Sequence, residues 1–169
     1  MADKIKNYAF DKHNSVNQLY DVHSYSVHLT MVRNVGVKFI HLIPEEAQDD
    51  VLNACLCHDL IEDTHETYNN VKDNTNERIA DLVYALTNEK GKTRKERAND
   101  KYYNGIKELK YATFIKLADR IANVEYSKIT GGKMYSMYKK ELNSFVQSLI
   151  TIDTEYNEMF NYLISLFEE

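Results

Sequence analysis

Hydrophobic residues recur at helical spacing along nearly the whole chain of 169 residues. One Pro and five Gly leave little material for the many turns of a β-rich fold. We therefore expect an all-α fold, a single helical bundle of about seven to nine helices that spans residues 1–169. The pattern places these helices at about 3–14, 26–43, 44–58, 65–72 and 75–87, around Asp119, and twice within 134–169, with a connector over 14–22.

The helix expected over 26–43 has its apolar stripe at Val27, Met31, Val35 and Phe39. His28 lies five residues after His23 and so is not stacked on it, and the sequence favours a plain core or surface role for it. His23 lies just before the helix start, where the positive end of the helix dipole disfavours an imidazolium. We therefore expect His23 to be neutral, which is the form in which a histidine binds a metal.

The stretch 53–64 combines a buried helix end with several polar groups. The small apolar residues before His58 predict burial, and they are followed by the adjacent His58-Asp59 pair and then by Glu62 and Asp63. An imidazole nitrogen and a carboxylate oxygen together suit Mn, Fe, Co or Zn. Two ligands hold an ion poorly, so we expect further ligands, with His23 upstream and Asp119 downstream as the candidates.

The helix around Asp119 has a wide apolar face. Its apolar residues fill an arc of about 180°, and Asp119 falls roughly 40° beyond the edge of that arc. Asn123 lies one turn later on the same side, whereas Lys116 and Arg120 are expected to point further toward solvent. Asp119 is therefore expected at the rim of the buried face, where a metal ligand can be reached from the core.

The order His, His-Asp, Asp, with the strings CHDLIEDT and IKLADRIANV, resembles the HD-domain metal-dependent phosphohydrolases. It is most similar to the small stand-alone RelA/SpoT-type hydrolases, which remove the 3′-pyrophosphate of ppGpp, and the resemblance runs from about Tyr8 to about Ser148. It implies one divalent transition metal, Mn²⁺ first, with Fe²⁺, Co²⁺ and Zn²⁺ as alternatives. The implied metal ligands are His23, His58, Asp59 and Asp119. Glu62 and Asp63 are implied to be catalytic, orienting or deprotonating the attacking water and assisting the leaving group.

The segment 88–97 is a dense basic cluster in a chain of net charge -5. The resemblance implies that one or two of its cations, such as Lys92 and Arg97, hold substrate phosphates. The other expected substrate-binding residues are Asn123, Lys116 and Arg120. In the alarmone hydrolases a basic, glycine-containing stretch precedes the first metal histidine, whereas 17–24 here has no Arg, Lys, Gly or Pro. We therefore expect a small nucleotide substrate, ppGpp-like first, with weak discrimination for guanine.

Composition excludes some classes of protein. The acidic net charge argues against a nucleic-acid polymer as partner. The N-terminus has no apolar signal region and no run approaches the roughly 20 apolar residues of a membrane span, so we expect a cytoplasmic protein without a membrane partner. Two alternative functions stay open: hydrolysis of another nucleotide by a nucleotidase or NADPH phosphatase, and a non-catalytic nucleotide-binding HD module. Assembly into a homo-oligomer also stays open. The Glu62-Asp63 pair favours the enzyme, because binding alone requires no water-activating pair.

Overall fold

The computed structural model describes residues 2–151 and 155–168, so 152–154 of the expected C-terminal helical region lie outside the described residues. The longer helices are α1 (Ala2–Ser15), α2 (Ser26–Lys38), α3 (Glu45–Cys57), α5 (Tyr68–Asn74), α6 (Glu77–Leu86), α8 (Asp100–Glu108), α9 (Ala112–Thr130), α10 (Lys133–Leu149) and α11 (Asn157–Ser165). The shorter elements are α4 (Leu60–Asp63), α7 (Arg94–Arg97), the 3₁₀ turn Ile40–Leu42, and the strands β1 (Leu19–Tyr20) and β2 (His23–Ser24). Within the described ranges nine helices have seven or more residues, which confirms the all-α expectation and its helix number.

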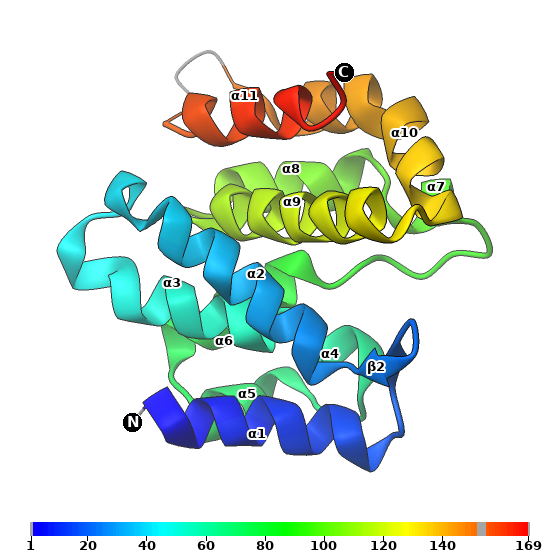
Figure 1. Ribbon diagram of the computed structural model, residues 1–169. Helices are drawn as coiled ribbons and strands as arrows, with labels where there is room; N and C mark the ends of the chain where they lie inside the picture. Colours follow the sequence, from blue (N-terminus) through cyan, green and yellow to red (C-terminus); the bar gives the residue numbers. More distant parts are fainter. Residues whose placement is uncertain (1, 152–154, 169) are drawn as a thin grey trace.

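Helix α9 lies at the centre of the bundle. It packs against α2, α3 and α6 on one side and against α8, α10 and α11 on the other. Figure 1 shows the resulting stack, with α1 and α5 at one end, α10 and α11 at the opposite end, and α9 between them. This position explains the long apolar face predicted for the helix around Asp119, because neighbours cover α9 on most sides.

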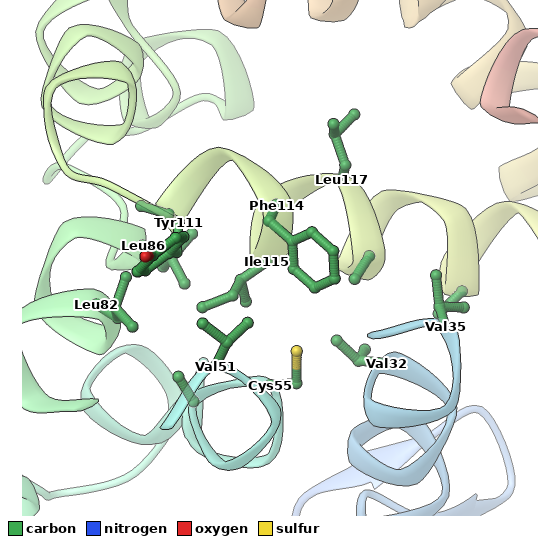
Figure 2. Close-up of a cluster of buried hydrophobic side chains, with 14 of the residues drawn as sticks. Val32, Val35, Val51, Cys55, Leu82, Leu86, Tyr111, Phe114, Ile115 and Leu117 are labelled. Carbon is green, nitrogen blue, oxygen red and sulfur yellow. The ribbon is translucent and has the colours of Figure 1, made fainter. Parts of the chain in front are cut away.

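Side chains from α2, α3, α6 and α9 meet in one buried cluster (Figure 2). Val32 of α2 and Cys55 of α3 face Phe114 of α9 in this cluster. Gly36 allows α2 and α3 to approach closely, since a Cβ atom there would lie 3.2 Å from the Cys55 sulfur.

The buried face of α2 differs from the predicted stripe. It consists of His28, Leu29, Val32, Val35 and Gly36. Val27 is 37% exposed, so the predicted stripe was displaced by about one position at the start of the helix. The helix also ends at Lys38, and a 3₁₀ turn follows, rather than continuing to residue 43. Because the face is rotated, His28 lies inside the bundle.

The sequence did not predict four elements: the hairpin before α2, the short helices α4 and α7, and helix α8. The connector before α2 contains an antiparallel hairpin in which Tyr20 pairs with His23, and Asp21 at its turn has a positive φ of 55°. Helix α8 was also missed, because only Tyr102 and Ile106 of its nine residues are buried. Within the described ranges, no helix combines the length and the apolar character that a membrane crossing requires.

Candidate metal centre

Four ligand-type side chains from three regions of the chain converge beneath the hairpin. The Nε2 atoms of His28 and His58 lie 3.3 Å apart. The Oδ1 atom of Asp119 lies 3.4 Å from the His28 Nε2 and 3.8 Å from the His58 Nε2. The Oδ2 atom of Asp59 lies 2.9 Å from the His58 Nε2 and 3.6 Å from the His28 Nε2. His28, His58 and Asp119 therefore direct donor atoms that all lie within 4.8 Å of one another, and Asp59 adds its Oδ2 beside the two imidazoles.

These distances fit a single divalent ion. Ligand atoms about 2.1 Å from one ion lie roughly 3.0 to 3.4 Å from each other, for octahedral and tetrahedral angles respectively. Three of the five separations, 2.9, 3.3 and 3.4 Å, match this range, and the other two, 3.6 and 3.8 Å, exceed it slightly. Two imidazoles and two carboxylates also form the mixed nitrogen and oxygen set preferred by Mn²⁺, Fe²⁺, Co²⁺ and Zn²⁺. His28, His58, Asp59 and Asp119 are thus the residues that could hold the metal.

His58 is oriented by its own helix. It follows the last residue of α3 and is 3% exposed, and its Nδ1 lies 2.9 Å from the carbonyl oxygen of Cys55. A carbonyl oxygen only accepts hydrogen bonds, so Nδ1 is the protonated nitrogen and the Nε2 lone pair of the neutral ring points to the cluster. Asp59 is fixed beside it, because the Tyr25 hydroxyl donates to its Oδ2 over 2.5 Å.

Asp119 is held by two neighbours on α9. The amide nitrogen of Asn123 donates to the Asp119 Oδ1 over 2.6 Å, and the Lys116 ammonium donates to the Oδ2 over 3.0 Å. Burial opposes ionisation of this carboxyl, but Lys116 and the two imidazoles outweigh it and hold the Asp119 pKa far below its ordinary value. Asp119 is therefore an anion under the conditions in which a metal binds.

The two carboxylates also control the protonation of His28. Burial opposes the charged imidazolium, but hydrogen bonds and charges from Asp119 and Asp59 prevail and raise the His28 pKa to about 9. The same pair raises the pKa of His58 against the effect of burial. In the absence of a metal, protons on the imidazoles balance the carboxylates, and a bound cation would replace those protons.

His23, the predicted first ligand, does not join the cluster. It lies on β2, is exposed, and has its ring 6.4 Å from that of Tyr126. His28 takes the place that was assigned to His23, because the hairpin turns the chain before α2 and the buried face of α2 includes residue 28. The structure brings the other three predicted ligands, His58, Asp59 and Asp119, together.

A cleft of ≈ 940 Å³ opens from this cluster to the surface. His28, Asp59 and Asp119 line it, and so do the predicted catalytic residues Glu62 and Asp63. Asp63 accepts a hydrogen bond from the Gln18 amide over 2.7 Å. Burial, with the negative charges of Asp59 and Glu62, raises the Asp63 pKa to about 6.

Glu62 is exposed at the cleft wall and accepts a hydrogen bond of 2.7 Å from the Asn88 side chain. It also lies 3.3 Å from the backbone nitrogen of Asn88, so both of its oxygens face the start of the basic segment. The contact connects α4, which follows the His58-Asp59 pair, to the loop that carries the cations. Glu62 is therefore positioned between the candidate metal ligands and the outer part of the cleft.

The structure places four of the five predicted substrate-binding residues at the cleft and one away from it. Arg97, Lys116, Arg120 and Asn123 line the cleft, whereas Lys92 of the same basic segment does not and is exposed elsewhere. The expectation that Lys116 and Arg120 point to solvent was wrong. Lys116 is 17% exposed beside Asp119, and Arg120 is 8% exposed.

Neighbouring helices explain this burial. The Arg120 guanidinium lies 4.1 Å from the Phe145 ring centre of α10 and pairs with Glu141 over 3.1 Å. Lys116 lies over the Tyr102 ring of α8, with 5.8 Å between the ammonium and the ring centre. Packing of α8 and α10 on this side of α9 is a tertiary effect that the pattern along α9 does not contain.

Further residues at or behind the cleft were not chosen as site residues from the sequence. Arg94 pairs with Glu141 over 2.9 Å, so Glu141 joins Arg94 to Arg120 across the outer cleft. His13 is fully buried behind the cluster, stacked on Tyr25 with 4.5 Å between ring centres, and burial lowers its pKa to about 4. A tyrosine-rich composition was the only sequence signal for such ring contacts, and it did not identify positions.

At the level of sequence, no protein-family model and no curated protein matches the chain. Comparison with solved structures identifies the fold class. A solved structure with this fold is described as a metazoan ortholog of SpoT that hydrolyses ppGpp and plays a role in starvation responses. It superposes with a TM-score of 0.73 at 22% sequence identity, covering 97% of this chain and 93% of the other. This likeness establishes the fold.

Proposed function

We propose that the protein is a metal-dependent phosphohydrolase that acts on a small nucleotide, with the 3′-pyrophosphate of ppGpp-like alarmones as the leading substrate. The observation that carries the proposal is the convergence of His28, His58 and Asp119, with Asp59 beside the two imidazoles, at the base of a cleft that also contains Glu62 and Asp63. The similar solved structure, a hydrolase of ppGpp by its description, supports the same reaction class.

The four converging side chains would hold one divalent ion, for which we propose Mn²⁺. Such an ion, when bound, supplies a Lewis acid that lowers the pKa of a water and neutralises phosphoryl charge. The carbonyl of Cys55 keeps the His58 Nε2 free for this role, and Asn123 holds the Asp119 Oδ1 in place. Positioning contacts of this kind raise metal affinity, because the ligands lose little freedom on binding.

Asp63 has the properties of the group that moves the proton. Its pKa of about 6 lies close to neutral pH, where a general base combines adequate basicity with an available ionised form. The Gln18 amide holds one of its oxygens, which fixes the direction of the carboxyl. We assign the proton transfer to Asp63, and we assign to Glu62 the orientation of the water or of the leaving group at the cleft wall.

The cations of the outer cleft would bind the substrate phosphates. Arg97 and Arg120 line the cleft, the latter with its guanidinium fixed by Glu141, and Lys116 lines it deeper, beside Asp119. The stretch from His13 to Val32, which includes the whole hairpin and the His28 ligand, contains no Lys or Arg. Guanine would therefore meet few charged partners on the hairpin side, and we propose weaker base discrimination than the alarmone hydrolases show.

A nucleotide panel assayed with the Mn²⁺-loaded protein tests the proposal. The panel contains ppGpp, its adenine counterpart and NADPH, and the measurement is released pyrophosphate or phosphate under steady-state conditions. We expect metal-dependent release from ppGpp, with the adenine counterpart within about tenfold of it in kcat/KM, a difference of about 1.4 kcal/mol. An exclusive preference for ppGpp would contradict the relaxed base recognition.

Other outcomes of the panel separate the alternatives. Turnover of NADPH or of a simple nucleotide without turnover of ppGpp would place the activity among the NADPH phosphatases or nucleotidases. Tight nucleotide binding without hydrolysis of any phosphate ester by metal-loaded protein would refute the enzyme and favour a nucleotide-binding module.

A further inference from the structure

The two imidazoles of the cluster are oriented by different means. The His58 Nδ1 donates to the Cys55 carbonyl, whereas the His28 Nδ1 is buried and has no hydrogen-bond partner among the described residues. Metal-binding histidines are usually held by a hydrogen bond at the nitrogen that does not bind the metal. His28 lacks that bond, so another contact has to fix the plane of its ring.

Tyr20 of strand β1 supplies such a contact. Its ring stacks on the His28 ring with 4.7 Å between the centres and 21° between the planes. Tyr25 meets the same imidazole edge-on, with 5.2 Å between the centres. A ring stacked in this way resists rotation of its partner, because turning the imidazole would drive its edge into the tyrosine face.

The hydroxyl of Tyr20 reaches a second ligand. It donates to the Asn123 Oδ1 over 2.9 Å, and the Asn123 amide nitrogen donates in turn to the Asp119 Oδ1 over 2.6 Å. Because the tyrosine occupies the amide oxygen, the amide group is fixed with its NH₂ toward Asp119. One side chain therefore contacts His28 of α2 directly and Asp119 of α9 through Asn123.

The hairpin is attached to α9 along one helical face. Asp119, Asn123 and Tyr126 follow one another at spacings of four and three residues, so they share that face. The Tyr126 hydroxyl donates to the Oδ2 of Asp21 at the hairpin turn over 2.9 Å. The Tyr126 ring also lies 4.8 Å from the Tyr20 ring, at 60°. The ring of Tyr20 therefore contacts both His28 and Tyr126.

We propose that Tyr20 is a positioning residue that holds His28 and Asp119 in the geometry that binds the metal. The proposal rests on the metal centre of the proposed function but not on its substrate. It gives the short hairpin a role at the site, as the part of the chain that joins a ligand of α2 to a ligand of α9.

Calorimetric titration of the metal-free protein with Mn²⁺ tests this role without any substrate, and Co²⁺ titration adds the visible absorption spectrum of the bound ion. Tyr20→Leu removes both contacts and should weaken metal affinity about 10- to 100-fold, as loss of a ligand-orienting group does. Tyr20→Phe keeps the stacked ring and loses one hydrogen bond, so about fivefold is expected. The Co²⁺ spectrum should change in the Leu variant, because the ligand geometry changes.

Tyr126→Phe is the matched control. It removes a tyrosine hydroxyl that bonds the same hairpin but contacts neither a candidate metal ligand nor Asn123. The Mn²⁺ affinity of this variant should therefore stay within about twofold of the wild type. Tyr20→Phe should also have no further effect in an Asn123→Ala background, since the hydroxyl acts through Asn123. Circular dichroism and thermal unfolding verify that each variant is folded. If Tyr20→Leu does not fold, the Mn²⁺ affinity of Tyr20→Phe, alone and in the Asn123→Ala background, decides whether Tyr20 positions the ligands.

The outcomes separate this proposal from the proposed function. Wild-type affinity in both Tyr20 variants, or equal weakening in Tyr126→Phe, would overturn the positioning role and leave the metal centre intact. Wild-type protein that binds metal but hydrolyses nothing would refute the proposed function, while the affinities would still decide the role of Tyr20.

Discussion

The two ends of the cleft differ in how firmly the fold holds their side chains. At the deep end, His28 and His58 are 2% and 3% exposed, and ring contacts and hydrogen bonds from the hairpin, α3 and α9 surround them. At the outer end, the cations of the α7 region are exposed, and Arg94 is 50% exposed in its pair with Glu141. The candidate metal ligands are thus held inside the core, while the cations proposed to bind substrate lie on a surface segment that can change without disturbing the core.

Removal of a deep-end ligand should have the largest effect. His58→Ala and Asp59→Ala should abolish stoichiometric Mn²⁺ binding, measured as metal content after dialysis, because two or three remaining ligands bind weakly. Metal at 100 times its Kd should raise the Tm of the wild type by about 5 to 10 °C, from roughly 2.7 kcal/mol of binding energy, and should not raise that of the variants. Stoichiometric metal in both variants would contradict this site.

The carboxylates between the two ends should affect turnover and leave the metal in place. Asp63→Asn and Glu62→Gln should each lower kcat by roughly 10² or more with unchanged metal content, as loss of an acid-base group does. Asp63 accepts the Gln18 hydrogen bond and has a raised pKa, so we expect Asp63→Asn to show the greater loss of kcat. Full activity of both variants would leave these residues with a structural role.

An outer-end cation should have a smaller effect, confined to substrate binding. Arg97→Ala should raise KM about tenfold with little change in kcat, since it removes one charge-assisted phosphate contact. Lys92→Ala is the matched control, because Lys92 belongs to the same basic segment but does not line the cleft. Equal effects of the two substitutions would mean that only the overall charge of the segment matters.

The smallest effect concerns stability. The Asp63 pKa is raised to about 6 from an ordinary 3.8, so the folded protein loses stability as pH rises between these values and the carboxyl ionises. Asp63→Asn should therefore increase the Tm of the metal-free protein at about pH 7.5 and leave it unchanged below about pH 3.5. Thermal unfolding at the two pH values measures the difference, and a lower Tm for the variant at the higher pH would contradict the assigned shift.

How much of the site could be predicted from sequence depends on whether each residue is fixed locally. His58 and Asp59 follow a buried helix end, and Asp119 lies on a helix with a long apolar face, so motif and periodicity together identified all three. His28 was missed because α2 has two overlapping apolar patterns. Val27 and Met31 suggested one face, whereas the packing of Gly36 against α3 selects the other.

Contacts between distant elements account for the remaining errors. Lys116 and Arg120 look like surface residues along α9, and only the packing of α8 and α10 buries them. The hairpin has two-residue strands and no turn glycine, so nothing in its sequence indicated that Tyr20 stacks on His28. The fold class and helix number, in contrast, follow from periodicity and composition, which are summed over the whole chain.

The metal content of a matched histidine pair tests the account most directly. His28→Ala and His23→Ala remove the same group from positions five residues apart, one buried in the cluster and the other exposed on β2. After loading with Mn²⁺ and dialysis, we predict about one ion per chain in His23→Ala, as in the wild type, and nearly none in His28→Ala. The reverse result, with metal retained in His28→Ala and lost in His23→Ala, would contradict the site described for this fold.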